Sequence, residues 1–581
     1  MQKSLMTGTD ATVAGPSLRP QGKTLRRAPL ATILIHWLVV LSIGISLATG
    51  WRIAADAPDA IVSAALAPVL PQGTVFYWHL ISGCVVLALM LTYTLYQISS
   101  GLGRRLTHLR NTENKSTSSA QSAVRLQRLD RKLYWLAFGL LSLAAMTGLL
   151  QYLNAAWPTT AAIEALHRLA AWGLVGYAIA HVGLQIAGGG LRRLATIFLP
   201  RNVHSRIAAM SMVIALGAVG GAVAMDRLLL HHLSIERTNT APRIDGWPDD
   251  AVWNSATTVE LSLANGANLP GGETTVVLKG LYDGERIYLL CEWADPTHSA
   301  AHVPLRKTER GWQIMQTAYR QADENRYYED KLALMLASSN PMAALTSVHL
   351  GTRPLKGEPG APGGRGLHYT TDGTILDVWH WKSVRNAYQR QADDNFFGPP
   401  LPAPSATPRV RDPDSGAWLP RYTAGYRKDP PGTYSGYEMN WEFFDEGWVL
   451  PLRLPDDPRD IAEPGFIETA SAGGARGPSS IKGWIEFNDT RPYAAGIDPL
   501  PVGTLLPSVL PTGQLTGDRG DIKAQGRWSE GRWYLELSRR LDTGSKRDIP
   551  IEDGTLLWVA VFDHSQTRHA YHLRPVQLQL N

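Results

Sequence analysis

The stretch HRLAAWGLVGYAIAH, residues 167–181, places two histidines within a long apolar segment. An ionisable side chain is costly inside a membrane-spanning helix, so each of these histidines needs a specific partner. At 3.6 residues per turn, His167 and His181 lie within about 40° of each other on one helix face. A rise of 1.5 Å per residue separates them by about 21 Å along the helix. This spacing predicts two cofactors stacked across one membrane, one near each leaflet.

The surrounding chain divides into an apolar part and a polar part. Up to about residue 230 the sequence contains long apolar runs, and beyond it Gly, Pro, Trp, Tyr and charged residues are abundant. A membrane-spanning helix needs about 20 apolar residues. Five segments meet this requirement, near 30–50, 75–97, 132–152, 164–187 and 207–226. The first is not expected to be a cleaved signal peptide, because about 28 residues precede it and its apolar core is too long.

We therefore predict a multidomain protein, with an all-α transmembrane bundle followed by an all-β sandwich. Four helices would form the core of the bundle, and a fifth would connect it to the sandwich. The predicted boundaries are a cytoplasmic tail at 1–28, the four-helix domain at 29–200, the fifth helix at 201–230 and the soluble domain at 231–581.

Basic residues indicate the orientation of the bundle. The net charge is +5, and the positive residues concentrate in the N-terminal tail and in alternate connections, whereas the intervening loops contain only Arg52 and Arg168. Basic loops stay on the cytoplasmic side, so the N-terminus is expected there and the soluble domain outside the membrane. The same distribution argues for a membrane topology signal and against a nucleic-acid partner. The residues that carry it are Lys23, Arg26, Arg27, Arg104, Arg105, Arg110, Lys115, Arg125, Arg128, Arg131, Lys132, Arg192, Arg193, Arg201 and Arg206.

Four histidines lie inside the predicted spans, and their depths suggest how they pair. His36 and His181 both lie near the cytoplasmic side, whereas His79 and His167 both lie near the outer side. Each pair could supply two axial imidazoles to a haem iron. The alternative for any single histidine is an interhelical hydrogen bond, but four in this arrangement favour cofactor ligation. Small residues that would let a flat macrocycle approach are Gly44, Gly83, Gly173 and Gly176.

Residues 28–200 resemble the bacterial di-haem cytochrome b561 family and its relatives, the membrane cytochromes of nickel–iron hydrogenase and formate dehydrogenase. The resemblance implies two haems b and electron exchange with quinol. It rests on Leu34-Ile35-His36-Trp37-Leu38, Ala48-Thr49-Gly50, His79, Thr147-Gly148, His167 and His181. The chain has two cysteines, Cys84 and Cys291, and no CxxCH motif, which excludes a c-type haem attachment.

The polar part shows the pattern of a β-sandwich: many short strand-like runs separated by turn signals. Hairpin turns are predicted at 281–284 and 529–531, and the long Gly- and Pro-rich loops 351–366 and 398–432 could line a site or contact a partner. Strands are predicted at 275–279, 286–292, 329–337, 374–381, 447–453, 481–487, 521–528, 532–538, 556–562 and 570–580.

Residues 243–581 resemble the haem-binding domain of the ethylbenzene dehydrogenase γ-subunit family, which is also found in cytochromes that serve dimethyl-sulfoxide-reductase-type molybdenum enzymes. The resemblance rests on Ile244-Asp245-Gly246, Glu329-Asp330-Lys331-Leu332-Ala333-Leu334-Met335, Asp377-Val378-Trp379-His380-Trp381-Lys382, Phe562-Asp563-His564 and Arg568-His569. It implies a haem b held by a Met and, in one branch, a Lys near the C-terminus.

Carried over to this chain, Met335 fits the first ligand, with core packing as its alternative role. The Lys is replaced, and His569 occupies the nearest position, with His572 and His564 as alternates. Trp379, Trp381 and Lys382 are expected to be scaffold or a wall at the haem edge. Some relatives carry a CxxCH that is absent at Ser347-Val348-His349-Leu350, so no covalent haem is expected here.

The leading hypothesis is a haem chain that carries electrons between the quinone pool and a periplasmic partner, such as a molybdoenzyme or a soluble cytochrome. The protein would be a multi-pass protein of a bacterial inner membrane, in contact with membrane lipid. The main alternative is a di-haem anchor that carries a haem-free sandwich resembling family-9 carbohydrate-binding modules. A third possibility is a metal- or superoxide-handling membrane protein that uses no quinone. No substrate-converting site stands out in the sequence.

Overall fold

The structure is a computed structural model of the 581-residue chain. It describes residues 28–55, 61–99, 118–153, 160–195, 230–319, 324–347, 369–370, 372–402, 426–430, 436–445, 448–457 and 483–581, with a few short pieces between them. Most of the predicted fifth span, 207–226, lies outside the described residues, as do most of the two long loops.

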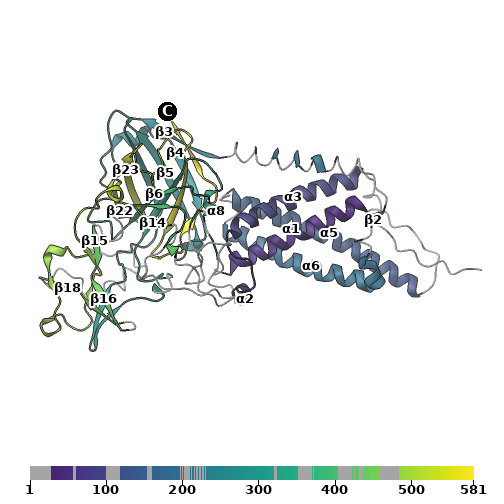
Figure 1. Cartoon of the computed structure of the whole chain (residues 1–581), viewed down its shortest axis with the longest axis horizontal. Coiled ribbons are helices and arrows are strands. Elements are labelled where there is room, and N and C mark those ends of the chain that lie inside the picture. The colour runs from purple at the N-terminus through teal and green to yellow at the C-terminus, as the bar shows by residue number, and fades with distance from the viewer. Residues whose placement is uncertain are drawn as a thin grey trace, which may run out of the picture.

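The N-terminal part is a helical bundle that extends away from a β-rich domain (Figure 1). Its four long helices are α1 (Leu30–Ala54), α3 (Val75–Ser99), α5 (Ser118–Tyr152) and α6 (Thr160–Ala195), and the short α2 (Ile61–Leu66) lies between α1 and α3. Among the described residues these four are long and apolar enough to cross a membrane. Their apolar side chains face outward, as expected of helices whose solvent is lipid: Leu34, Trp78, Leu149 and Ile179 are all exposed. The predicted α-helical bundle is therefore confirmed for these four spans.

The bundle consists of two helical hairpins. α1 packs along α3, and α5 packs along α6, whereas the contacts between the two hairpins are far sparser. Gly173 of α6 shows the close approach within one hairpin, because a Cβ added there would lie 2.8 Å from Leu140 Cδ2 of α5. Close packing at small residues is the usual way that membrane helices associate. Between the two hairpins, by contrast, the helices are not packed as tightly as within each hairpin.

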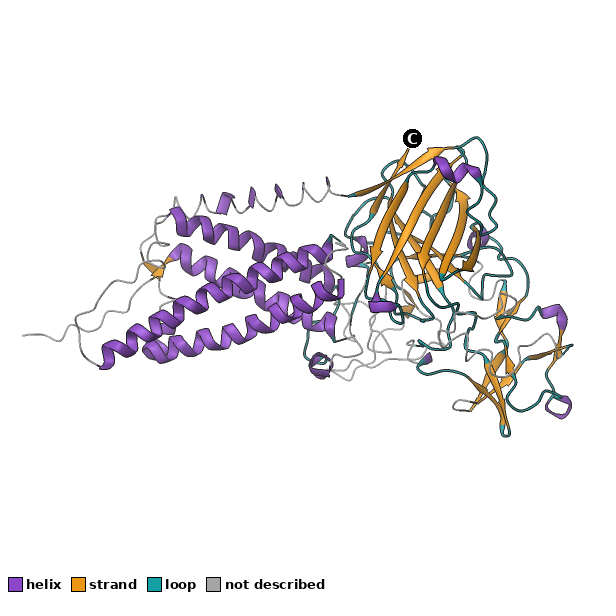
Figure 2. Ribbon diagram, turned by 180° about the vertical axis from the view of Figure 1, so that it is seen from behind, coloured by secondary structure: helices purple, strands orange, loops and turns teal. Residues whose placement is uncertain are grey.

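The β-rich domain is built around a sheet that folds into a sandwich (Figure 2). The strand order is β14-β11-β10-β9-β24-β26-β3-β5-β6-β23-β22, with β25 paired to β24 and β4 paired to β5. β3 is parallel to both of its neighbours and joins the two layers. The strands are β3 (His231–Arg237), β4 (Thr258–Leu263), β5 (Thr274–Tyr282), β6 (Arg286–Ala294), β9 (Lys331–Ala337), β10 (Leu376–Lys382), β11 (Asp393–Phe397), β14 (Tyr426–Lys428), β22 (Lys523–Ser529), β23 (Arg532–Arg540), β24 (Leu556–Phe562), β25 (Ala570–Tyr571) and β26 (Val576–Leu580).

The two layers enclose one apolar core, because alternate residues of each strand point inward. Trp381 of one layer contacts Trp293 and Trp533 of the other, with ring centroids 6.3 and 5.1 Å apart. Gly526 leaves room for Trp381, since an added Cβ would lie 2.2 Å from its ring. The predicted β-sandwich is confirmed, and Trp379 and Trp381 are core residues of it.

Most predicted strands are present, with small shifts of their ends, but the predicted strand 570–580 is interrupted at 572–575 and forms β25 and β26. The hairpin turns at 281–284 and 529–531 are confirmed, and Glu530 and Gly531 both have positive φ, as a tight two-residue turn requires. The predicted strand at 481–487 is wrong over its described part: it forms one isolated bridge at Trp484 and then a 3-10 helix, η6 (Phe487–Asp489). Gly483 passes directly against the Ala300 carbonyl, which diverts the backbone from a ladder.

A smaller five-stranded sheet with its own core lies beside the sandwich. Its order is β16 (Trp441–Asp445), β17 (Trp448–Pro451), β8 (Gly311–Ile314), β7 (Leu305–Thr308) and β20 (Leu505–Leu506). Four two-stranded pairs complete the described sheets: β1 (Ala28–Pro29) with β2 (Pro200–Arg201), β12 (Leu401–Pro402) with β13 (Tyr422–Thr423), β15 (Tyr437–Met439) with β21 (Val509–Pro511), and β18 (Arg453–Pro455) with β19 (Thr490–Pro492).

The Ile-Asp-Gly motif at the start of the domain is a carboxylate-binding turn. The backbone amides of Asp245 and Gly246 both donate to Glu536 Oε2 at 2.9 Å, and Trp253 Nε1 donates to Oε1 at 2.9 Å. Gly246 has φ +83° and lies against Arg527, so it combines positive φ with a close approach. The motif therefore fixes the N-terminal segment of the domain to β23.

Among the described residues, backbone, helix-cap and side-chain contacts join the sandwich to one end of the bundle. Gly73, before α3, forms two backbone hydrogen bonds with Leu350, of 2.9 and 2.8 Å. The amide of Ala161, in the first turn of α6, donates to Glu273 Oε1 at 2.7 Å. Arg574 lies 5.8 Å from the ring of Tyr152 at the end of α5. Glu273 thereby caps a helix N-terminus, where a negative charge is favourable.

Candidate functional site

The four membrane histidines meet as two pairs. The rings of His36 on α1 and His181 on α6 have centroids 6.5 Å apart, and those of His79 on α3 and His167 on α6 are 6.1 Å apart. These are the two pairs that membrane depth predicts. The His79–His167 pair lies near the end of the bundle that the sandwich contacts, because both residues lie within about two turns of the N-termini of their helices.

The separation of the rings fits a metal ion between them. A metal–imidazole bond of about 2.1 Å places the centroids of two opposed rings about 6 Å apart. Each pair joins the two hairpins, which otherwise touch little. Beside Gly44, Gly83 and Gly176 an added Cβ would meet no atom within 4 Å, so these helix surfaces are open to a flat group. Four histidines in this arrangement suit a haem iron at each end of the bundle.

Two threonines set the tautomer of the His79–His167 pair. Thr147 Oγ1 donates to the Leu143 carbonyl at 2.7 Å, so at 3.0 Å from His167 Nδ1 it accepts the ring proton. Thr49 Oγ1 likewise donates to a backbone carbonyl and lies 3.1 Å from His79 Nδ1. Protonation at Nδ1 leaves Nε2 with a lone pair, which is the state that binds a metal.

The Ser46 carbonyl oxygen gives independent support, because it lies 3.0 Å from His79 Nδ1 and can only accept. Sequence reasoning did not single out Ser46, and the repeated Thr-Gly dipeptide was used only as a family feature. The glycines have a steric role: a Cβ at Gly50 would lie 3.0 Å from His79 Cε1, and one at Gly148 would lie 3.3 Å from His167 Cε1. Thr-Gly thus holds an imidazole against the helix.

The His36–His181 pair has a different environment. Tyr177, one turn before His181, stacks on its ring with centroids 5.5 Å apart and an interplanar angle of 26°. Trp37 meets the ring of His36 edge-on, at 5.8 Å. Sequence reasoning missed Tyr177, although residues four apart share a helix face and the i, i+4 spacing could have found it. The two pairs therefore differ in how their rings are held.

Met335 lies on the face of the sheet that points away from the sandwich core. Leu334 and Leu336, its neighbours on β9, are buried in the core, whereas Met335 is partly exposed. Two small residues, Ala333 and Ala560, lie opposite each other on adjacent strands of the same face. Both are only partly buried, although they occupy the middle of the sheet. This face therefore offers Met335 and a shallow floor of alanines.

The C-terminal histidines His572 and His569 lie in different environments. His572 is buried, its Nε2 accepts the Val559 amide at 2.8 Å, and its Nδ1 lies 2.6 Å from the Arg574 carbonyl oxygen. Burial lowers the pKa of His572 to about 4. Both ring nitrogens are occupied, so this alternate ligand has a structural role. His569 is partly buried on the sheet face, with its ring 4.7 Å from that of Phe562.

The strand register does not bring Met335 and His569 together. Met335 pairs with Trp558 on β24, whereas His569 contacts Phe562, four residues further along the strand. At about 3.3 Å per residue this is a separation of about 13 Å. His380 on β10 is nearer, because it lies two residues beyond Val378, the other partner of Met335.

His380 was not among the predicted ligands, but it lies on the same face of the sheet as Met335. Its Nδ1 is 2.8 Å from Tyr426 Oη, and its ring stacks on Phe562 at 5.6 Å. Its Nε2 is buried and has no hydrogen-bond partner among the described residues. Burial, assisted by Lys382 and Lys331, lowers the pKa of His380 well below its ordinary value. The ring is neutral and can act as a ligand.

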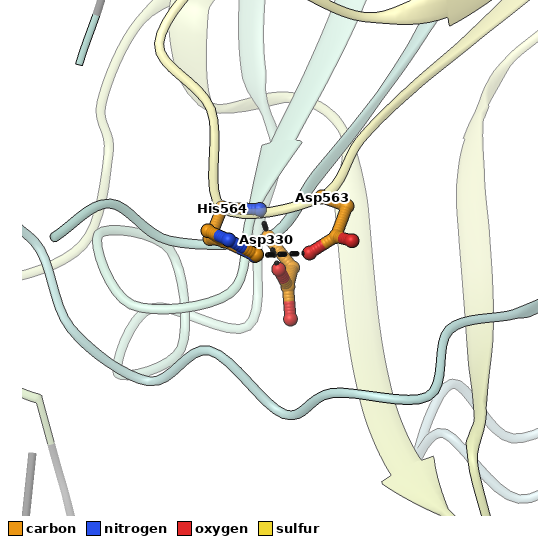
Figure 3. A group of neighbouring side chains, drawn as sticks. All are labelled: Asp330, Asp563 and His564. Carbon is orange, nitrogen blue, oxygen red and sulfur yellow. Dashed lines mark hydrogen bonds and ion pairs between the residues drawn. The ribbon is translucent and has the colours of Figure 1, made fainter. Parts of the chain in front are cut away.

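The other alternate, His564, belongs to a buried polar network at the start of β9 (Figure 3). Its Nδ1 contacts Asp563, and its amide donates to Asp330 Oδ1 at 2.9 Å. Asp330 Oδ2 accepts the Ser299 amide and Trp533 Nε1, at 2.9 and 3.2 Å. Burial and neighbouring carboxylates raise the pKa of Asp330 well above its ordinary value. Because protein donors satisfy these oxygens, the group links strands and does not present a metal site.

Two protein-family models match the chain over separate ranges. The model for prokaryotic cytochrome b561 matches residues 27–200, and the model for ethylbenzene dehydrogenase matches residues 250–574. A search of curated proteins found no match.

Solved structures similar to this chain include two of a carbohydrate binding module family 9 from Caldicellulosiruptor kristjanssonii, one in complex with cellotriose and one in complex with glucose. Both are 10% identical, cover 60% of this chain and 94% or 95% of their own, and have TM-scores of 0.20 and 0.21. At such TM-scores the likeness supports no conclusion about fold or ligand.

Proposed function

Because the chain belongs to the ethylbenzene dehydrogenase family and carries a prokaryotic cytochrome b561 domain, we propose that it moves electrons between a quinone pool and a partner outside the membrane. It is an integral membrane protein, and its b561 domain supports transmembrane electron transfer. The proposal rests on the two pairs of facing imidazole rings, whose centroids are 6.5 Å apart in one pair and 6.1 Å apart in the other.

In the membrane domain, His36 and His181 would hold one haem b, and His79 and His167 would hold the other. Haem iron with two imidazole ligands takes up and releases one electron at a time. Thr49 and Thr147 keep their histidines in the Nδ1-protonated form, so Nε2 is available without any proton loss. Quinol would deliver or receive electrons at this domain, as the b561 match suggests.

The positive-inside distribution of Arg and Lys supports a cytoplasmic N-terminus and a periplasmic sandwich in a bacterial inner membrane. In this orientation the His79–His167 pair is the outer one, and it lies at the end that contacts the sandwich. Electrons would pass from this pair into the soluble domain. A periplasmic redox partner, such as a molybdoenzyme or a soluble cytochrome, would exchange them there.

A third haem b would lie on the face of the sheet that points away from the sandwich core, with Met335 as one ligand. The alanine pair Ala333–Ala560 gives the flat group access to the sheet. The opposite ligand would be an imidazole of the same face, His569 or the nearer His380. A thioether opposite a nitrogen ligand raises the haem potential, which suits an electron acceptor outside the membrane.

The test is the haem content and redox titration of the purified full-length chain in detergent. We expect three haems b per polypeptide and reduction of the membrane haems by a quinol analogue. Met335→Ala should remove one component and leave the two bis-His components, whereas Met439→Ala, the matched control, should remove none. His380→Ala and His569→Ala then identify the second ligand, because only the true ligand removes the same component as Met335→Ala.

Two haems with a spectrum unaltered in Met335→Ala would overturn the third haem and favour a haem-free, sugar-binding sandwich. Reduction by dithionite without any reduction by the quinol analogue would overturn the quinone assignment. The bis-His assignment is independent of both results, since it depends on the four membrane histidines.

A further inference from the structure

Five aspartates from separate parts of the chain converge at one edge of the sandwich. They are Asp394 on β11, Asp429 just after β14, Asp518 and Asp521 around the 3-10 helix η8 (Asp518–Gly520), and Asp548 before β24. Asp394, Asp521 and Asp548 each offer one oxygen, and these three oxygens lie within 4.8 Å of one another. Asp429, Asp518 and Asp548 form a second such triad, so Asp548 is common to both.

Six carboxylate oxygens of this cluster lack protein donors among the described residues, although Asp518 Oδ2 accepts a hydrogen bond from Ser545 Oγ and Asp548 Oδ2 accepts one from Thr543 Oγ1. Asp394 and Asp429 are 0% exposed, and neither oxygen of either side chain accepts a hydrogen bond from the described residues. Asp521 Oδ1 and Asp548 Oδ1 are also buried and accept no hydrogen bond from the described residues. Buried polar atoms in proteins are almost always paired, so unpaired oxygens that face one another indicate a missing ligand.

The positive charge at the cluster is too small to balance it. Arg539 is buried and donates to Asp377 Oδ2 at 2.6 Å, and it reaches Asp394 at 3.6 Å and Asp548 at 3.7 Å. At the rim, Arg547 lies 3.8 Å from Asp518. These two guanidinium groups face six carboxylates when Asp377 is included. Like charges buried together are costly unless a cation joins them.

The network around Asp330, Asp563 and His564 provides an internal comparison (Figure 3). It also brings buried carboxylates close together, but backbone amides and an indole satisfy the Asp330 oxygens. The five-aspartate cluster differs because neither oxygen of Asp394 or Asp429, and one oxygen each of Asp521 and Asp548, has a donor among the described residues. Crowding of carboxylates alone therefore does not explain why oxygens of the five-aspartate cluster lack donors.

We propose that the five-aspartate cluster binds calcium. The donors are all carboxylate oxygens, which excludes the sulfur and imidazole ligands that zinc prefers. Calcium takes six to eight oxygens in flexible geometry, whereas magnesium needs a strict octahedron and keeps its waters. Asp518 and Asp521 are partly exposed, so an ion can enter from solvent.

The ion would join the two layers of the sandwich on the side away from β3. β11 belongs to one layer, and the segment before β22 belongs to the other; they meet through a hydrogen bond from the Ala392 amide to the Ile522 carbonyl, 3.1 Å long. Asp394 and Asp521 lie next to this junction, one on each layer. A calcium ion shared between them would act as a clamp where the ends of the sheet come together.

The experiment uses the full-length holoprotein in detergent. After dialysis against EGTA, the protein is re-equilibrated with CaCl2 or MgCl2 and the bound metal is measured by mass spectrometry. Thermal unfolding is followed with and without the added ion. We expect one or two calcium ions per chain, and a rise in the Tm of the sandwich of about 5 °C or more with calcium and much less with magnesium. The absorbance of the membrane haems serves as an internal reference and should not change.

Asp548→Asn should abolish calcium binding and the calcium-dependent rise in Tm, because Asp548 belongs to both triads. Asp249→Asn, at an exposed aspartate of the same domain, is the matched control and should keep both. If Asp548→Asn does not fold, the wild-type titration still decides. A wild-type chain that binds no calcium after EGTA treatment and shows the same Tm in calcium and in EGTA would overturn the proposal.

Discussion

Thr147 Oγ1 lies 3.0 Å from His167 Nδ1 while donating its own proton to the Leu143 carbonyl at 2.7 Å. The hydroxyl has a single hydrogen, so the imidazole must be the donor of the first contact. One side chain thus determines which ring nitrogen faces the space between the helical hairpins. Thr49 and His79 repeat the relationship on the other hairpin.

Thr147→Val should raise the potential of one membrane haem. The substitution removes an acceptor from His167 Nδ1, which makes the imidazole a weaker electron donor to iron and disfavours the oxidised state. A tenfold change in relative affinity for the two redox states corresponds to about 59 mV, and we expect a rise of this order. Redox potentiometry measures it. Thr94→Val is the matched control. It removes a hydroxyl that also donates to a helix carbonyl, that of Met90, but lies away from the histidine pairs. An equal shift in potential in Thr94→Val would contradict the explanation.

His79→Ala and His167→Ala should each remove the same haem component, and His36→Ala and His181→Ala should each remove the other. Low-spin ligation needs both imidazoles of a pair, so either loss is sufficient. Low-temperature absorbance spectra and haem content per polypeptide report the result. The pairing would be refuted if His36→Ala depleted the component that His79→Ala depletes.

Glu536→Ala should destabilise the sandwich by about 2–4 kcal/mol, because it leaves the amides of Asp245 and Gly246 and the indole of Trp253 without an acceptor. Chemical denaturation followed by tryptophan fluorescence measures the free energy of unfolding. Glu260 is exposed on β4, and Glu260→Ala should change it by less than about 0.5 kcal/mol. Equal losses in the two variants would refute the role of Glu536 as an anchor.

Asp295→Asn should stabilise the sandwich at pH 8 and have little effect at pH 4. Burial and the neighbouring Asp563 raise the pKa of Asp295 to about 7. A folded-state pKa above the unfolded value of about 3.9 means that stability is lost as pH rises from about 4 to 7. The gain from Asn at pH 8 is at most about 4 kcal/mol, since one pKa unit is about 1.4 kcal/mol.

The Tm of wild type and Asp295→Asn at the two pH values checks this prediction. The amide of Thr297 donates to Asp295 Oδ1 at 3.0 Å, and it can donate in the same way to the side-chain oxygen of the substituted asparagine. The fold should therefore tolerate the change. A difference in Tm that is the same at both pH values would show that charge is not the cause.

Helical periodicity explains why the membrane pairs could be predicted from the sequence. A helix has one geometry, so spacing along the chain converts directly into depth and direction, and two hairpins across a membrane allow few pairings. The tautomer of His167 could not be predicted, because it depends on a hydroxyl of another helix, 20 residues earlier in the chain.

The soluble site shows where such reasoning fails. Strand alternation gives the face of Met335, but its neighbours depend on the register of β9 with β10 and β24. The resemblance suggested His569, whereas the register places His380 nearer. The aspartate cluster was invisible for a similar reason: Asp394 and Asp548 are 154 residues apart, and only the folding of the sheet brings them together.

The hydrogen bonds between Gly73 and Leu350, and between Ala161 and Glu273, have a kinetic consequence. A domain on a loose tether would reach its electron donor by diffusion, and the rate would follow the length of the linker. Here the backbone of the membrane domain is bonded directly to the sandwich, so the distance between the two is a constant of the fold, and the proposed electron transfer would cross a fixed gap. A chimera that exchanged only the sandwich would lose that constant unless the new sandwich also kept the segments around Leu350 and Glu273.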